Sequence, residues 1–145
     1  MRLVKNRGEI IKTETTKTTN EVQIRELIND WAKTTREGDD DAVLSNHAAD
    51  VLIFDVLAPL QYKGSAVYRK SWDEWRPTDE GEALFEMHEL GITAGETVAF
   101  AHCLIECGKK PNSDWVRTTF CLQKTDGKWM VTHQHGSMPV SRKGA

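Results

Sequence analysis

The second half of the chain, from residue 83 to residue 137, consists of strand-like segments with no helical pattern between them. Runs that alternate or cluster β-branched and aromatic residues span 83–93, 96–107, 114–124 and 128–137. Gly95, a polar loop that begins at Gly108, and Asp126-Gly127 separate these runs. Asp-Gly between two strands is a strong signal for a tight hairpin turn. Because strands joined by short turns pair antiparallel, this half predicts a single antiparallel sheet.

The first half predicts helices. Asn20 is suited to cap a first helix, with Gln23 in the capping-box position. Helical spacing then places a set of residues on one face: Ile24, Leu27, Ile28, Trp31 and Thr35. Gly38 ends this helix, and a short second helix begins at Asp39 or Asp40.

One strand and a third helix complete this half. Residues 50–57, DVLIFDVL, form a nearly continuous apolar run, which is typical of a strand covered on both faces. Gly64-Ser65 opens the third helix and Pro77 closes it. The order of helices and strands therefore predicts an α+β fold, in which helices pack on one face of a curved antiparallel sheet.

The 145 residues fit one domain. Organisation begins at Asn20, so we expect a domain over 20–140, an N-terminal extension over 1–19 and a C-terminal tail over 141–145. The polar, threonine-rich stretch KTETTKTTN closes the extension and has no apolar period. It predicts either a strand that docks on a neighbouring chain or a loose tail.

Composition excludes several classes of protein. A formal net charge of −3 offers no basic excess to hold a phosphate backbone, so we expect no nucleic-acid partner. No apolar run approaches the ~20 residues that span a bilayer, and the first residues lack the apolar core of a signal peptide. Three cysteines do not make a disulfide framework. These observations predict a cytoplasmic protein with reduced thiols and no membrane contact.

Asp55 is the strongest candidate for a catalytic residue. Seven of the eight residues from Val51 to Ala58 are apolar, and this carboxylate interrupts them. A buried ionised carboxylate is costly unless it is paired or hydrogen-bonded, and such groups serve as general bases or acids. The alternative is an aspartate at the end of the strand that faces water.

Arg117 lies in the middle of a predicted strand, on the same face as Thr119 and Cys121. In a cavity it would pair with Asp55 or hold an anionic group of a ligand. Otherwise it is a surface arginine lying along the sheet.

His133 and His135 share one face of the last strand, whereas Gln134 lies on the other. The pair could hold one metal ion, but zinc needs a third protein ligand and the spacing identifies none, so we predict that they bind no metal. With a two-residue Asp126-Gly127 turn and no irregularity, Gln134 shares a face with Arg117 and Thr119. A bulge or a three-residue turn would reverse the two faces.

With this element order, the chain resembles the NTF2-like superfamily, and specifically its SnoaL-like and ketosteroid-isomerase-like branch. The resemblance covers roughly residues 20–140 and rests on four pieces: REGD at 36–39, AADVLIFD at 48–55, YKG at 62–64 and DGKWMVTHQHGS at 126–137. The last piece is also similar to the end of the association domain of calcium/calmodulin-dependent kinases.

The resemblance implies a cone-shaped fold in which three helices lie on the concave face of a curved sheet, and a homodimer formed through that sheet. It places Asp55 where ketosteroid isomerases keep their catalytic aspartate. Trp31 and Thr119 stand where those enzymes have their tyrosine and protonated aspartate donors. An indole N–H and a threonine hydroxyl do not reproduce an acidic donor pair, which argues against steroid isomerisation.

Two functions remain open. The first is a cofactor-independent isomerase, cyclase, dehydratase or hydrolase that acts on a small apolar or partly polar compound, with Asp55 transferring a proton. The second is a non-catalytic dimeric module that binds a ligand or a partner. The predicted pocket residues besides Asp55 are Trp31, Arg117, Thr119, His133, Gln134 and His135. No cofactor is expected.

Overall fold

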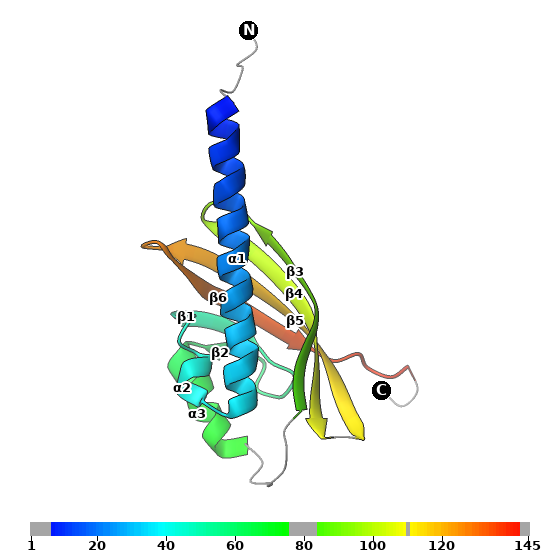
Figure 1. The fold of residues 1–145 in the computed structure, drawn as a ribbon. Coiled ribbons are helices and arrows are strands. Elements are labelled where there is room, and N and C mark those ends of the chain that lie inside the picture. The colour runs from blue at the N-terminus through cyan, green and yellow to red at the C-terminus, as the bar shows by residue number, and fades with distance from the viewer. Residues whose placement is uncertain (1–6, 76–83, 110, 143–145) are drawn as a thin grey trace.

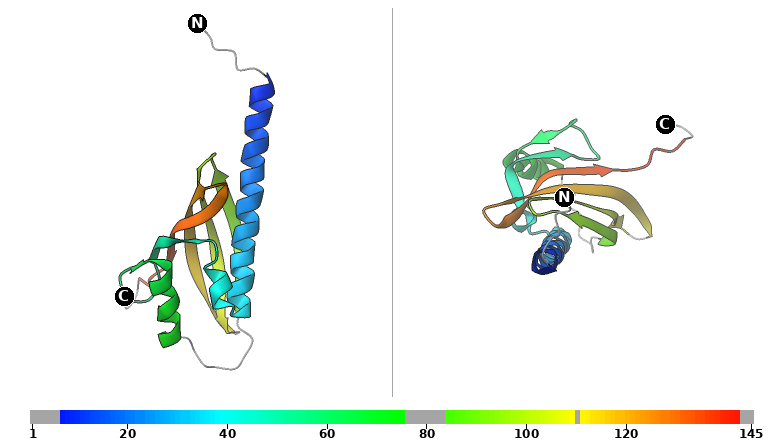
Figure 2. Two further views of the ribbon diagram at one scale, coloured as in Figure 1. Left: turned by 90° about the vertical axis from the view of Figure 1, so that its left-hand side faces the viewer. Right: turned by 90° about the horizontal axis from the view of Figure 1, so that it is seen from above.

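The computed structural model describes residues 7–75, 84–109 and 111–142. In these ranges the helices are α1 (Arg7–Glu37), α2 (Asp40–Val43) and α3 (Ser65–Trp75). The strands are β1 (His47–Phe54), β2 (Tyr62–Lys63), β3 (Leu84–Ala94), β4 (Val98–Lys109), β5 (Asn112–Thr125) and β6 (Lys128–Ser137). Figures 1 and 2 show this arrangement, with α1 running along the sheet and α2 and α3 near its lower end.

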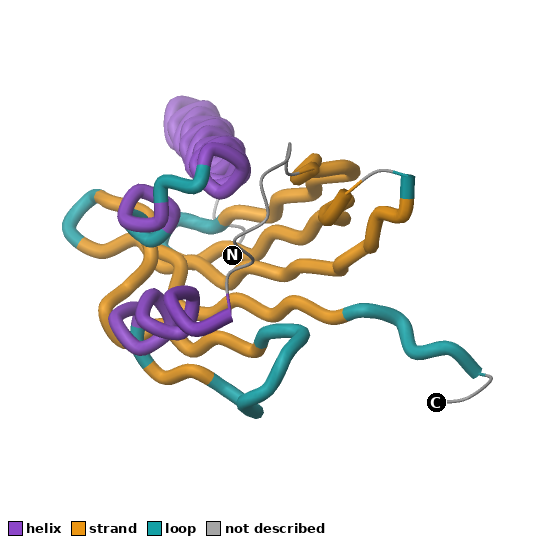
Figure 3. Tube along the Cα trace, turned by 90° about the horizontal axis from the view of Figure 1, so that it is seen from below, coloured by secondary structure: helices purple, strands orange, loops and turns teal. Residues whose placement is uncertain are grey.

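The strands form one sheet in the order β2-β1-β6-β5-β4-β3. The predicted α+β fold with a curved sheet and three helices is therefore confirmed. One detail of the prediction is wrong, because β1 pairs with β6 in parallel while the other neighbours pair antiparallel. The chain between β1 and β6 includes four further strands and α3, and this long connection allows β1 to lie beside β6 in that direction (Figure 3).

The first helix begins at Arg7, so the prediction that Asn20 caps it is wrong. Asn20 is 1% exposed and lies inside α1, facing the sheet. The apolar period starts at Ile24 because the helix packs on the sheet from about this point. The earlier turns extend beyond the sheet edge (Figure 1), where a helix needs no apolar face. The threonine-rich stretch is thus helical, and neither a docking strand nor a loose tail.

The other predicted helices are confirmed. Asp39 caps α2 by accepting a hydrogen bond from the backbone N–H of Ala42 at 3.3 Å, and Gly38 turns the chain with a φ of +74°. Ser65 begins α3 as expected, whereas the predicted end at Pro77 lies outside the described residues. The two-residue strand β2 was not predicted, since a segment this short has no detectable period.

The core lies between α1 and the sheet. Ile24 and Ile28 of α1 are fully buried against strand residues such as Phe120 and Val131. Trp31 continues this face and packs edge-on against Phe120, with ring centroids 5.0 Å apart. None of the described helices has the length and apolar character required to cross a membrane.

Candidate active site

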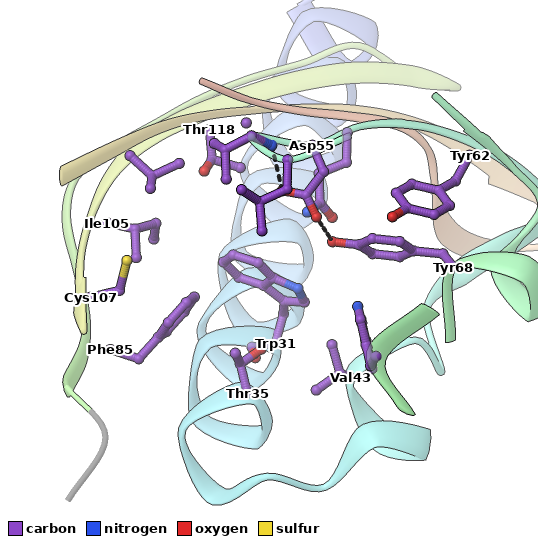
Figure 4. A pocket seen from close by; sticks show the side chains of 16 residues that line it. Trp31, Thr35, Val43, Asp55, Tyr62, Tyr68, Phe85, Ile105, Cys107 and Thr118 are labelled. Carbon is purple, nitrogen blue, oxygen red and sulfur yellow. Dashed lines mark hydrogen bonds between the residues drawn. The ribbon is translucent and has the colours of Figure 1, made fainter. Parts of the chain in front are cut away.

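A cavity of about 320 Å³ lies between the sheet and the three helices. Its helical walls come from Trp31 and Thr35 of α1, Val43 of α2, and Tyr68 and Trp72 of α3. The sheet curves over the other side and contributes Phe85, Ile105, Cys107 and Thr118 (Figure 4). An apolar hollow with few polar groups is the usual form of a small-molecule site.

Asp55 and Tyr68 form the central polar pair of this cavity. The Tyr68 hydroxyl donates a hydrogen bond of 2.7 Å to Oδ2 of Asp55, and the backbone N–H of Val56 donates one of 2.7 Å to Oδ1 (Figure 4). Burial raises the pKa of Tyr68 well above its ordinary value, and the negative charge of Asp55 adds to this. Tyr68 therefore stays protonated at neutral pH and acts as a donor to the carboxylate.

Aromatic rings surround this pair. The ring centroid of Tyr62 from β2 lies 5.0 Å from that of Tyr68, and the ring centroid of Trp72, one helical turn along α3, also lies 5.0 Å from it. Trp31 enters from α1 and is packed against Phe85 with ring centroids 5.4 Å apart. These contacts hold Tyr68 in place and give the cavity the flat apolar walls that suit a ring-shaped ligand.

Gln134 brings an amide into the cavity and is held by a buried histidine. Nε2 of His47 and Oε1 of Gln134 are 2.8 Å apart, and both residues are buried. Burial lowers the pKa of His47, although the hydrogen bond to Gln134 partly opposes this, so the ring is neutral at pH 7. A neutral ring protonated at Nε2 donates to the amide oxygen. This leaves the NH₂ group of Gln134 as the donor available to a ligand.

Cys107 lines the cavity but is not suited to nucleophilic attack. Burial raises its pKa, and the nearby charge of Asp114 raises it further, so the neutral thiol dominates at pH 7. Cys103, Cys107 and Cys121 are all free.

A bulge in β6 decides which face the predicted residues occupy. Thr125 faces Lys128 across the expected two-residue turn, but Leu122 pairs with Val131 while Cys121 pairs with His133. Thr132 is the extra residue, and it reverses the faces of everything that follows it in β6. The reversal that the sequence left open thus occurs.

As a result, only part of the predicted pocket lines the cavity. Asp55, Trp31 and Gln134 are there. Arg117, Thr119, His133 and His135 point to the opposite face of the sheet, called the outer face below. The expectation that these four line the cavity is corrected by the bulge, because alternation along β5 and β6 separates them from Gln134.

Three of the four residues of the outer group, His133, His135 and Arg117, have a local partner. Nδ1 of His133 lies 2.7 Å from the carbonyl oxygen of Leu52, and both histidine rings pack edge-on against Phe54. Arg117 donates from Nε to Oγ of Ser137 at 3.2 Å, so its suggested pairing with Asp55 is wrong. Arg117 and Thr119 border a separate shallow depression on the outer face.

Tyr68, Tyr62 and His47 were missed as site residues. Tyr68 and Trp72 show helical i, i+4 spacing in the sequence, but this pattern indicates packing as readily as a site. Tyr62 belongs to a strand too short to detect, and His47 precedes the apolar run of β1. Only the tertiary fold brings these three side chains near Asp55 and Gln134.

Comparisons with known proteins agree with this architecture. Residues 24–141 match the model of the SnoaL-like domain family. An NTF2-like protein of unknown function from Pseudomonas putida KT2440 is 30% identical, covers 87% of this chain and 91% of its own, and superposes with a TM-score of 0.82. Among curated proteins, no sequence matches the chain.

Two more distant structures share the fold alone. A protein from Parabacteroides distasonis ATCC 8503, provisionally named a ketosteroid isomerase, is 16% identical over 80% of this chain and 85% of its own, with a TM-score of 0.65. An NTF2-like protein from Streptomyces avermitilis, provisionally named a dehydratase, is 17% identical over 86% and 99%, with a TM-score of 0.70. The similarity of the closing run to a kinase association domain gains no support from these comparisons.

Proposed function

The chain belongs to the SnoaL-like domain family, and we propose that it is a cofactor-independent enzyme that transfers a proton within a small, ring-containing substrate. Asp55 is the proposed base, and Tyr68 and Gln134 are the proposed hydrogen-bonding partners. The observation that carries the proposal is the 2.7 Å hydrogen bond between Tyr68 and Asp55 on the wall of an aromatic cavity.

The reaction class follows from what the cavity offers. A carboxylate can accept a proton from a carbon next to a carbonyl group and return it to another carbon, which gives an isomer. If a hydroxide leaves after the proton is removed, the net reaction is loss of water. Both outcomes balance without an oxidant or a reductant. Isomerase and dehydratase are also the names given provisionally to two proteins that share this fold.

The polar groups are arranged for such a step. Tyr68 stays protonated and can stabilise negative charge that develops near Asp55. The NH₂ group of Gln134 is a second donor, and the neutral His47 behind it fixes its orientation. Steroid isomerisation is not proposed, because Trp31 offers only an indole N–H and Thr119 points to the outer face, so neither supplies an acidic donor in the cavity.

The alternative is a module that binds a ligand without changing it. Both oxygens of Asp55 already accept hydrogen bonds, from Val56 N–H and from Tyr68, and such a carboxylate can simply tie the loop after β1 to α3. The same cavity would then hold an apolar ligand with Gln134 as its polar contact. The two functions differ in whether a bound carbon acid exchanges its protons.

Exchange in heavy water tests this without knowledge of the natural substrate. We suggest 2-tetralone, a fused-ring ketone with exchangeable protons next to its carbonyl, followed by proton NMR in D₂O. Wild-type protein should accelerate the loss of those signals over buffer, and Asp55→Asn should reduce the acceleration by about 100-fold or more, as expected when a general base is removed. Asp50→Asn is the matched control, because Asp50 lies exposed on the same strand.

Each outcome separates the two functions. Acceleration that depends on Asp55 and not on Asp50 supports proton transfer. Binding of the ketone, seen as a change in tryptophan fluorescence, without acceleration supports the binding module and contradicts catalysis. If Asp55→Asn and wild type exchange equally fast, Asp55 is not the base.

A further inference from the structure

A second group of reactive side chains lies on the outer face of the sheet, away from the cavity. Glu86 of β3 and Glu106 of β4 are directly opposite each other in the strand pairing, and His88 is two residues along from Glu86. Nε2 of His88 lies 3.7 Å from Oε1 of Glu106 and 3.9 Å from Oε2 of Glu86. One potential ligand atom from each of these three residues lies within 4.8 Å of those of the other two.

The histidine nitrogen in this group has no hydrogen-bond partner among the described residues. Nε2 of His88 is shielded from solvent, and no described residue accepts or donates a hydrogen bond to it. The indole ring of Trp115 covers the imidazole, with ring centroids 5.1 Å apart. A shielded nitrogen that points at two carboxylates without bonding to either leaves its lone pair or its proton unsatisfied.

The carboxylates are also arranged in an unusual way. Like charges placed directly opposite on neighbouring strands destabilise a sheet, and Glu86 and Glu106 are such a pair. Ser113 of β5 donates a 2.8 Å hydrogen bond to Oε2 of Glu106, which leaves Oε1 to face His88. This is how an outer hydrogen bond orients a carboxylate that binds a metal.

We propose that Glu86, His88 and Glu106 bind a divalent transition-metal ion such as Zn²⁺, which links β3 to β4 on the outer face. One imidazole nitrogen and two carboxylate oxygens are a ligand set that zinc accepts, with a fourth position left for water. Around a tetrahedral ion with bonds of ~2.1 Å, ligand atoms lie ~3.4 Å apart. The distances from Nε2 of His88 to the two carboxylates, 3.9 and 3.7 Å, exceed this by a few tenths of an ångström, and the glutamate ligand atoms lie within 4.8 Å of each other. Rotation of the partly exposed glutamate side chains would close these gaps.

The site is independent of the proposed function. It lies on the opposite face from Asp55, and its ligands are not those of the cavity. It also differs from the His133 and His135 pair, which showed no third ligand in the sequence. No spacing rule could have found it, because Glu106 joins the other two residues only through the pairing of β3 with β4.

The test is a zinc titration of protein purified without a metal-affinity column and stripped with a chelator. By calorimetry, wild type should bind a single ion per chain with a dissociation constant of about 10 µM or lower, in the range of a specific three-ligand site. Glu106→Gln should weaken binding at least about tenfold, and Ser113→Ala up to about tenfold. Glu96→Gln removes one exposed glutamate from the β3–β4 turn and should leave binding unchanged.

A second measurement reports position. Co²⁺ quenches nearby tryptophan fluorescence, so a cobalt titration should quench wild type, and Trp115→Phe should remove that quenching while retaining the ion. The proposal is overturned if wild type binds no zinc at about 100 µM, or if Glu106→Gln binds as well as wild type. It is also overturned if binding survives Glu106→Gln but disappears in a His133→Gln, His135→Gln double variant, which would assign the ion to that pair.

Discussion

Asn20 is a single polar residue that joins three parts of the fold. Its side-chain NH₂ donates to the carbonyl oxygen of Gly95 at 3.0 Å. Its oxygen accepts from Nζ of Lys124 at 3.1 Å and from Nε1 of Trp129 at 3.3 Å. A buried amide with all of these contacts fixes the position of α1 along the sheet.

We predict that Asn20→Ala lowers the free energy of unfolding by about 1–3 kcal/mol, because the buried Nε1 of Trp129 loses an acceptor and the partly buried carbonyl oxygen of Gly95 loses a donor. Urea denaturation followed by circular dichroism measures this. Thr19→Ala, at an exposed position one residue earlier in α1, should change the value by less than about 0.5 kcal/mol. Equal effects of the two substitutions would mean that the buried contacts of Asn20 contribute little.

His47 makes the stability of the protein depend on pH. Burial lowers its pKa from the ordinary 6.5, so the unfolded chain binds a proton at a higher pH than the folded chain. Stability is therefore lost as pH falls below about 6.5 toward the lower folded-state pKa, with a slope of up to about 1.4 kcal/mol per pH unit. Above pH 6.5 neither state holds this proton, and the contribution is independent of pH.

His47→Asn should remove this dependence. We predict that the difference in unfolding free energy between wild type and the variant shrinks as pH falls from 7 to 5, because only the wild type loses the His47 contribution. Denaturant unfolding at several pH values checks the sign. A difference that grows in acid would show that His47 is protonated in the folded protein.

At the scale of elements, the register of β6 determines which of its side chains line the cavity. Its bulge at Thr132 turns Gln134 and Gly136 inward, where both line the cavity. A Cβ atom placed on Gly136 would lie 3.5 Å from Cγ1 of Val116 and 3.9 Å from Oδ1 of Asp55. These are ordinary van der Waals distances, so an alanine fits without strain and fills space beside Asp55.

We therefore predict that Gly136→Ala folds normally, with an unfolding free energy within about 1 kcal/mol of wild type, but binds 2-tetralone about tenfold more weakly. Titration followed by tryptophan fluorescence measures the affinity. Ser137→Ala, on the outer face one residue later, should bind the ketone as wild type does. Unchanged affinity for Gly136→Ala would mean that the ketone does not occupy the space beside Asp55.

Most of the helices and strands could be predicted from the sequence, but only part of the candidate site could. Asp126-Gly127, Gly38-Asp39 and Gly64-Ser65 are local signals, and the turns and helix ends form where these residues stand. The bulge at Thr132 leaves no such local signal, because the extra residue is tolerated only in the context of the paired β5. Asp55 was found because a lone charge in an apolar run is visible locally. Its partner Tyr68 is 13 residues away and meets it only in the folded chain.

At the scale of the whole molecule, the two faces of the sheet have different surroundings. One face is covered by helices and holds the core and the cavity. The outer face carries apolar side chains that the chain leaves exposed, with Val98 57%, Phe100 50% and Trp115 44% accessible. Side chains alternate along β4, so Ala101 and Cys103 face the core while Val98 and Phe100 do not.

We predict that two copies of the chain associate through the outer face and cover these residues. Apolar side chains exposed along one face of a sheet are typical of an interface, and burying them releases water from apolar surface. Light scattering at micromolar concentration should give twice the chain mass of 16.4 kDa.

Phe100→Asp should give the monomer mass, because a charge buried without a partner in an apolar contact is costly. Leu60→Asp places the same charge at a 92% exposed position in the loop after β1 and should leave the dimer intact. A wild-type protein that runs as a monomer would end the prediction, and a dimer that survives Phe100→Asp but not Leu60→Asp would move the contact to that loop.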